Sequence, residues 1–210
     1  MVRSDGWMRT GVASLVICVS SGALLWRGTD GFHALTSEAA RRLAIAASPR
    51  SVPAVELEDQ DGRSFTLGRY RGRPLVVDFV YTRCTSVCPL LSESFRRLYV
   101  APESSPRGDD GRLPLLSITF DSLDTPARLR EYAAHYRADG HSWRFARVRN
   151  ARDLAPLLQA FGVVVIGDGR GGFQHNAAMH VVDPGGRLSR VLDLGASPAD
   201  VARAAAETSR

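Results

Sequence analysis

The residues with the clearest chemistry are Cys84 and Cys88, which lie where an apolar, strand-like run turns into a helix in the segment DFVYTRCTSVCP. Unpaired amides and the dipole at a helix N-terminus stabilise a thiolate and lower the pKa of a nearby cysteine. Side chains at positions i and i+4 share one helix face, so the two sulfurs can meet or hold one ion. In an oxidising compartment such a pair is a local disulfide, a redox pair or a metal site. A purely structural disulfide is the weakest interpretation, because so short a loop constrains the unfolded chain least.

The composition of the chain excludes several kinds of chemistry. The 210 residues include no lysine, so all 27 basic residues are arginine, and the formal net charge is +5. Without lysine the chain has no Schiff-base nucleophile, no pyridoxal phosphate anchor and no phosphate-loop lysine. The arginines are scattered among 22 acidic residues and form no basic block, so we predict no nucleic-acid partner.

Residues 1–27 have the pattern of an export signal or a membrane anchor. Two arginines precede an uncharged, mostly apolar run of 16 residues from Gly11 to Trp26, which is short for a spanning helix of about 20 residues. Because Trp26 suits a membrane interface, we favour an uncleaved anchor in a bacterial inner membrane, with the N-terminus cytoplasmic and the domain in the periplasm. Cleavage would instead leave a soluble periplasmic domain. Cys18, inside the run, is interpreted as a small apolar filler.

The rest of the chain divides into a linker, residues 28–52, and a domain, residues 53–210. A short helix is predicted in the linker at Ser37–Ala47, and apolar strands are predicted in the domain at Leu75–Tyr81 and Leu115–Phe120, each followed by a helix. Further on we expect a helix over Asp153–Phe161, a hairpin of Ala178–Asp183 with Leu188–Leu194, and a final helix capped by Ser197. This order predicts an α/β sandwich whose mixed sheet, flanked by helices, is parallel at first and antiparallel at its end.

Three segments in order, PLVVDFVYTRCTSVCPLL, LPLLSITFDSLDTPARLREYAAHY and HNAAMHVVDPGGRL, resemble the Sco/SenC family. The resemblance covers about residues 53–208 and implies a thioredoxin-like fold in a membrane-anchored copper chaperone of cytochrome c oxidase assembly. It implies that copper is bound by Cys84, Cys88 and His175, and it places Asp121 and Asp124 near the site. Two thiolates and one imidazole make a soft, three-coordinate set that suits Cu(I), whereas zinc normally takes a fourth ligand. Whether the cargo is Cu(I) or Cu(II) stays open.

Other candidate ligands near His175 have better explanations. His180 lies five positions further on and, in an extended strand, points to the opposite face. Met179 shares the face of His175, but core packing accounts for it more simply. The chain departs from the family pattern at Thr85, Asn176 and His180, which leaves the metal affinity and the loop geometry open.

The alternative function is an exported thiol–disulfide oxidoreductase or redox sensor that uses the Cys84/Cys88 pair. Asp78 lies six residues before Cys84, at the spacing of the buried acid beneath the reactive cysteine of thioredoxin. A buried carboxyl with a raised pKa suits proton exchange with a thiol, although a hydrogen-bonded structural role explains Asp78 equally well. The CxxxC spacing, and a stretch without proline over residues 171–178, argue against a general oxidoreductase.

We therefore predict a metallochaperone that is not an enzyme in the turnover sense, with a redox-active dithiol at Cys84 and Cys88. Its task would be to deliver copper to the copper-site subunit of a cytochrome c oxidase, or to reduce the cysteines of that site. Other copper chaperones and thiol reductants are further expected partners, and the N-terminal segment is the expected link to the membrane.

Overall fold

The computed structural model describes residues 4–28, 37–101 and 112–209, and the chain divides into two compact units, Met1–Ala47 and Ser48–Arg210. The first unit contains helix α1 (Ser4–Gly28) and helix α2 (Ser37–Ala47), and α2 has the bounds predicted from the sequence. Residues 1–3 of the predicted anchor and 29–36 of the predicted linker lie outside the described residues. Among the helices that are described, none combines the length and hydropathy needed to cross a membrane.

The second unit is built on an eight-stranded mixed sheet in the order β1-β10-β9-β4-β5-β6-β2-β3. The strands β4 (Leu75–Val80), β5 (Leu115–Thr119) and β6 (Trp143–Val148) run parallel to one another. The other pairings in this sheet are antiparallel and involve β1 (Arg50–Ser51), β2 (Glu56–Asp59), β3 (Ser64–Thr66), β9 (Met179–Val182) and β10 (Arg187–Leu192). Strand β4 is buried at every position, as expected for an apolar strand with a neighbour on each side.

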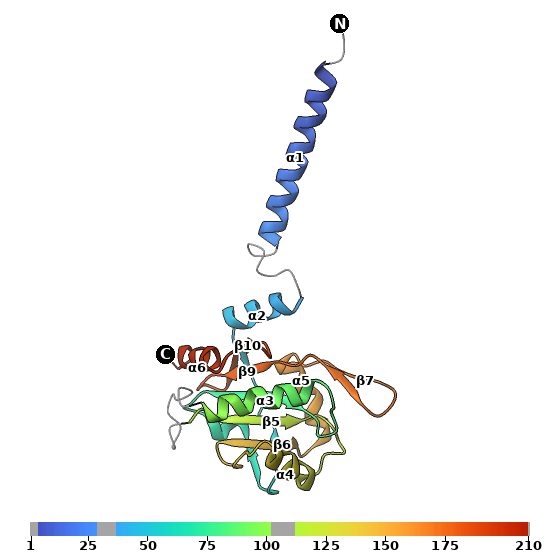
Figure 1. Ribbon diagram of the computed structural model, residues 1–210. Coiled ribbons are helices and arrows are strands. Elements are labelled where there is room, and N and C mark those ends of the chain that lie inside the picture. The colour runs from blue at the N-terminus through green and yellow to red at the C-terminus, as the bar shows by residue number, and fades with distance from the viewer. Residues whose placement is uncertain (1–3, 29–36, 102–111, 210) are drawn as a thin grey trace. The chain divides into compact units, whose positions relative to one another are not determined.

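Helices flank this sheet (Figure 1). On one face, α3 (Val87–Val100) and α4 (Pro126–His135) pack aromatic side chains on Trp143 and Phe145 of β6. On the other face, α5 (Leu154–Phe161) packs Phe161 on Phe79 of β4. The sheet register places Phe145 level with the residue before Phe79, and consecutive residues of a strand point to opposite faces. Helix α6 (Pro198–Glu207) packs beside α3 and β9, and two short 3-10 turns, η1 (Leu67–Tyr70) and η2 (Ala151–Asp153), complete the unit. The predicted α/β sandwich is thereby confirmed.

Helix ends lie where the sequence has capping residues. The side chain of Thr125 accepts a hydrogen bond from the third residue after it, and a proline follows it in the first turn of α4. Ser197 and Asp200 form a capping box at the start of α6. Helix α5 ends at Gly162, whose φ of 67° is a left-handed conformation that glycine adopts without strain. The predicted helices and strands agree with the observed bounds to within about two residues.

Two elements that matter for the site have no clear sequence signal. One is β6, where Arg144 and Arg147, three positions apart, interrupt the apolar residues and break the alternation typical of a strand. The other is a second, two-stranded sheet in which β7 (Val165–Gly167) pairs antiparallel with β8 (Phe173–His175). This hairpin, residues 165–175, is separate from the main sheet and carries His175.

Candidate metal centre

The two cysteines occupy the turn that joins β4 to α3. Because α3 begins at Val87, Cys84 precedes the helix and Cys88 lies in its first turn. The amide of Cys88 donates a hydrogen bond to Sγ of Cys84 at 3.4 Å, and the hydroxyl of Ser86 lies 3.7 Å from the same sulfur. Both thiols are free and buried, with 6% of Cys84 and 0% of Cys88 exposed. The turn therefore directs donors at the helix N-terminus toward the sulfur of Cys84.

The two thiols differ in acidity. Burial raises the pKa of Cys84, but hydrogen bonds from the Cys88 thiol, from the amides of Cys88 and Ser86 and from the Ser86 hydroxyl outweigh it and lower the pKa to about 7. Burial raises the pKa of Cys88 far above its ordinary value, and the hydrogen bond that it donates to Cys84 raises this pKa further. Cys84 is thus the more acidic thiol of the pair, and Cys88 keeps its proton near neutral pH.

His175 reaches the cysteine pair from β8. Its Nε2 atom lies 3.5 Å from Sγ of Cys88, and its ring meets the ring of Phe120 edge-on with the centroids 5.0 Å apart. The Nδ1 atom is buried without a hydrogen-bond partner. Burial lowers the pKa of the imidazole, which favours the neutral form that binds metals.

Cys88 is the link among the three predicted ligands, since its amide contacts Cys84 and its sulfur contacts His175. In the part of the chain that the structure describes, no three His, Cys, Asp or Glu side chains already stand close enough to hold a metal ion together. The chemistry of the three donors nevertheless fits a soft ion. They offer an acidic thiol, a second thiol beside it, and an imidazole with a buried, unpartnered nitrogen.

Asp121 and Asp124 fasten the start of the cysteine turn to the end of β5. Asp124 is fully buried and accepts hydrogen bonds from the amide and hydroxyl of Thr82, at 3.0 and 2.5 Å, and from the hydroxyl of Thr119 at 2.5 Å. Asp121 accepts two hydrogen bonds from the guanidinium of Arg83, at 3.1 and 2.6 Å. Asp124 therefore holds the backbone and side chain of Thr82, and Asp121 holds the side chain of Arg83, just before Cys84.

Asp78 lies within β4 and has an unusual environment. The residue is 0% exposed, and neither carboxyl oxygen has a hydrogen-bond partner. Burial raises its pKa to about 7, although the nearby Ser117 hydroxyl opposes this shift. The negative charge of Asp78 also contributes to the raised pKa of Cys88. Asp78 is thus a buried carboxyl that exchanges its proton near neutral pH.

The residues that follow His175 have structural roles. Asn176 closes the base of the hairpin, since its Oδ1 accepts the amide of Val164 at 2.7 Å and its Nδ2 donates to the carbonyl of Gly162 at 2.9 Å. His180 is buried in the core, with Nδ1 3.2 Å from the carbonyl of Val77 and its ring against aromatic side chains of β4 and α5. Met179 is 1% exposed and also belongs to the core.

Several residues that shape this site were not singled out by the sequence patterns. Tyr81, Thr82 and Arg83 bind Phe173, Asp124 and Asp121, and Asn176, which the sequence marked only as a departure from the family pattern, binds the base of the hairpin. All four are polar residues within three positions of a predicted ligand. That proximity is the signal by which they can be found.

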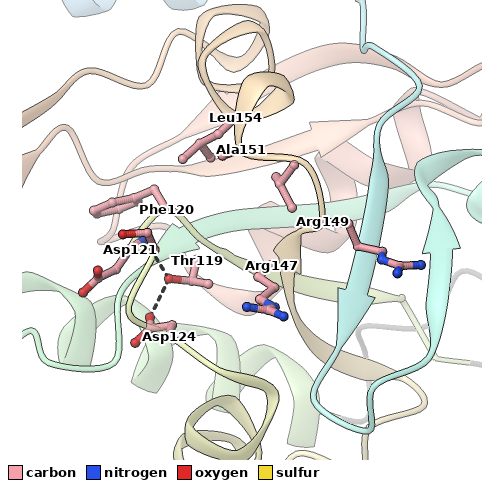
Figure 2. A pocket seen from close by; sticks show the side chains of 10 residues that line it. Thr119, Phe120, Asp121, Asp124, Arg147, Arg149, Ala151 and Leu154 are labelled. Carbon is pink, nitrogen blue, oxygen red and sulfur yellow. Dashed lines mark hydrogen bonds between the residues drawn. The ribbon is translucent and has the colours of Figure 1, made fainter.

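A pocket of about 160 Å³ lies at the carboxyl ends of β5 and β6, and neither the cysteines nor His175 line it. Figure 2 shows Thr119 hydrogen-bonded to Asp124, with Arg147 and Arg149 on the side away from Phe120. Both arginines are paired with glutamates of β2. The pocket thus adjoins the cysteine site through Phe120, Asp121 and Asp124, while the cysteines and His175 themselves lie outside its lining.

The sheet, the cysteine pair at a strand–helix junction and the histidine on a neighbouring hairpin define a thioredoxin-like domain with a dithiol site. Residues 46–210 match the SCO1/SenC family, and the chain belongs to this family.

Relatives agree with this assignment. A Stutzerimonas stutzeri protein whose name proposes that it binds copper is 29% identical over 144 residues, which cover 66% of this chain and 67% of that protein. Bradyrhizobium japonicum ScoI, solved with copper bound, has a TM-score of 0.58 and 23% identity, over 75% of this chain and 97% of the other. BsSco, described as a member of the Sco family of cytochrome c oxidase assembly proteins with a disulfide switch, has a TM-score of 0.63 and 21% identity, over 77% and 95%. These similarities confirm the predicted fold and family.

Proposed function

We propose that this chain binds one copper ion as cargo through Cys84, Cys88 and His175. It then delivers the ion to, or reduces the cysteines of, the copper-site subunit of a cytochrome c oxidase. The observation that supports this most is the position of Cys88, between the sulfur of Cys84 and the imidazole of His175. Membership of the SCO1/SenC family and the copper-bound relative support the choice of metal, and the description of BsSco supports the link to the oxidase.

The donor atoms set the conditions for binding. Two sulfurs and a neutral imidazole suit Cu(I). Cys84, with its pKa of about 7, is ready to bind near neutral pH, whereas the buried Cys88 must lose a proton that it holds tightly. Metal binding therefore releases a proton from Cys88, and affinity increases with pH. The charge of the ion offsets the cost of placing two thiolates in a buried site.

The N-terminal unit completes the proposal. An export signal or anchor in residues 1–27 would place the site in the periplasm, and the linker would join it to the domain, whose unit begins at Ser48, inside the predicted linker range of 28–52. In that oxidising compartment the dithiol must be kept reduced to hold copper, so a thiol reductant is a required partner.

A thiol–disulfide reductase is the second candidate, and the unequal acidity of the two thiols favours it. The Cys84 thiolate would attack one sulfur of a partner disulfide, forming a mixed disulfide and releasing one partner thiolate. Cys88, on losing its proton, would then attack Cys84 and release the second thiolate. The partner gains two electrons, and the chain is left with a Cys84–Cys88 disulfide. Asp78, a buried carboxyl whose charge acts on Cys88, would be the group that takes up this proton.

Copper binding to the reduced full-length protein tests the proposal. In an anaerobic Cu(I) competition titration, we expect one tightly bound ion, loss of tight binding in Cys84→Ser and Cys88→Ser, and weaker binding in His175→Ala. Cys18→Ser and His141→Ala are matched controls, because Cys18 lies in α1 and His141 is exposed, and both should bind like the wild type. Brisk turnover of disulfides without copper retention would instead support the reductase.

A further inference from the structure

The position of His175 depends on what holds its hairpin, because β7 and β8 form a sheet of their own. Asn176 secures the base of the hairpin, at residues 162 and 164. At the other end, Asp168 accepts the amides of Arg170 and Gly172 and so orders the turn internally. Neither contact attaches the strand β8 to the segment that carries the cysteines.

Tyr81 makes that attachment. Its hydroxyl donates a hydrogen bond to the carbonyl of Phe173 at 3.0 Å and accepts one from the amide of Phe173 at 3.2 Å. The Tyr81 hydroxyl thus hydrogen-bonds both the carbonyl and the amide of Phe173, as the backbone of a residue in a neighbouring strand would. Phe173 is two residues before His175, so its side chain and that of His175 share one face of the strand.

The ring of Tyr81 is itself enclosed. Its centroid lies 5.4 Å from that of Phe120 and 5.3 Å from that of Phe173, and only 5% of the residue is exposed. Phe120 also contacts Phe173 and His175, with centroids 5.6 and 5.0 Å apart. The rings therefore fix where the hydroxyl stands, and the hydroxyl fixes the backbone of β8.

We propose that Tyr81 is a positioning residue whose hydroxyl holds β8 so that His175 faces Cys88. Tyr81 lies three residues before Cys84, and the amide of Cys84 donates to the carbonyl of Tyr81 at 3.2 Å. The same turn thus carries Tyr81 and the first thiol, so the Tyr81 hydroxyl links the backbone of β8 directly to the segment that carries the cysteines. This inference rests on the proposed role of His175 as a copper ligand.

Tyr81→Phe is the informative variant, because it keeps the ring and removes only the hydroxyl. Loss of two neutral hydrogen bonds is expected to weaken Cu(I) binding roughly tenfold. Tyr70→Phe is the matched control, since the Tyr70 hydroxyl is buried without a hydrogen-bond partner, and it should bind copper like the wild type.

A double-mutant cycle adds the decisive readout. In the His175→Ala background, Tyr81→Phe should have no further effect on affinity, because the ligand that it positions is gone.

A second readout needs no metal. Amide hydrogen exchange on the copper-free, reduced full-length protein should be faster over residues 165–175 in Tyr81→Phe and unchanged there in Tyr70→Phe. The inference is overturned if Tyr81→Phe binds copper and exchanges amides like the wild type, or if it weakens binding equally with and without His175. Failure of the proposed function looks different: wild-type protein would not bind copper, while the exchange experiment would still decide whether Tyr81 holds the hairpin.

Discussion

The Nε2 atom of His175 lies 3.5 Å from Sγ of Cys88, although 87 residues separate the two in the chain. The sheet explains this approach. Strand β9 pairs antiparallel with β4, with His180 opposite Val77, so residues that precede β9 lie beyond the carboxyl end of β4. The cysteine turn begins at that end. The histidine thus reaches the dithiol because of strand register, and the β7–β8 hairpin sets its final position.

The unequal acidity of the thiols gives a first prediction. Thiolate absorbance near 240 nm, followed in Cys18→Ser, should show one thiol that titrates near pH 7 and a second that stays protonated to much higher pH. In Cys88→Ala the low midpoint should rise, because a hydrogen-bond donor to the Cys84 thiolate is lost. Two equal midpoints near the ordinary cysteine value would contradict this account of the pair.

The buried carboxyl of Asp78 predicts a pH-dependent stability. Its pKa is raised from 3.8 to about 7 in the folded chain, so between these values the unfolded chain ionises while the folded chain keeps its proton. The stability contributed by this group is complete below pH 4 and is lost as pH rises through 7. At about 1.36 kcal/mol per pKa unit, the loss is on the order of 4 kcal/mol.

Urea unfolding of wild type and Asp78→Asn between pH 4 and pH 8 measures this effect. Because asparagine cannot ionise, the stability of the variant relative to the wild type should increase across this range. A difference that does not change with pH would show that Asp78 is not the buried, unpartnered carboxyl described above.

Asp124 predicts a large loss of stability on truncation. Asp124→Ala leaves the buried hydroxyl of Thr119 and the half-buried hydroxyl and amide of Thr82 without their acceptor, at a cost of about 2–4 kcal/mol in the free energy of unfolding. Asp200→Ala is a control at an exposed site, because it removes the carboxylate half of the capping box of α6 and leaves the N-cap Ser197 in place, which should cost at most about 1 kcal/mol. Equal losses of unfolding free energy in the two variants would mean that the hydrogen bonds between Thr82 and Asp124 contribute little to stability.

Some of this architecture follows from local sequence and some does not. The junction of β4 and α3 is predictable, because a strand that is apolar except for Asp78 and a proline in the next helix lie a few residues apart. His175 is different: no local pattern marks it, and only the resemblance to a known family predicts its role. The bond between Tyr81 and Phe173 joins residues 92 positions apart. This hydrogen bond forms only where tertiary packing positions the short β7–β8 hairpin, whose strands have weak sequence signals. Local sequence therefore does not predict it.

The ligand set of bound copper tests the central claim most directly. X-ray absorption at the copper edge of the reduced, Cu(I)-loaded full-length protein should show two sulfur scatterers and one nitrogen scatterer. The nitrogen should disappear in His175→Ala, which still binds copper, whereas Cys84→Ser and Cys88→Ser should retain too little copper to give a spectrum of the site. A wild-type spectrum with two sulfurs alone, or a nitrogen signal that persists in His175→Ala, would contradict the three-ligand site.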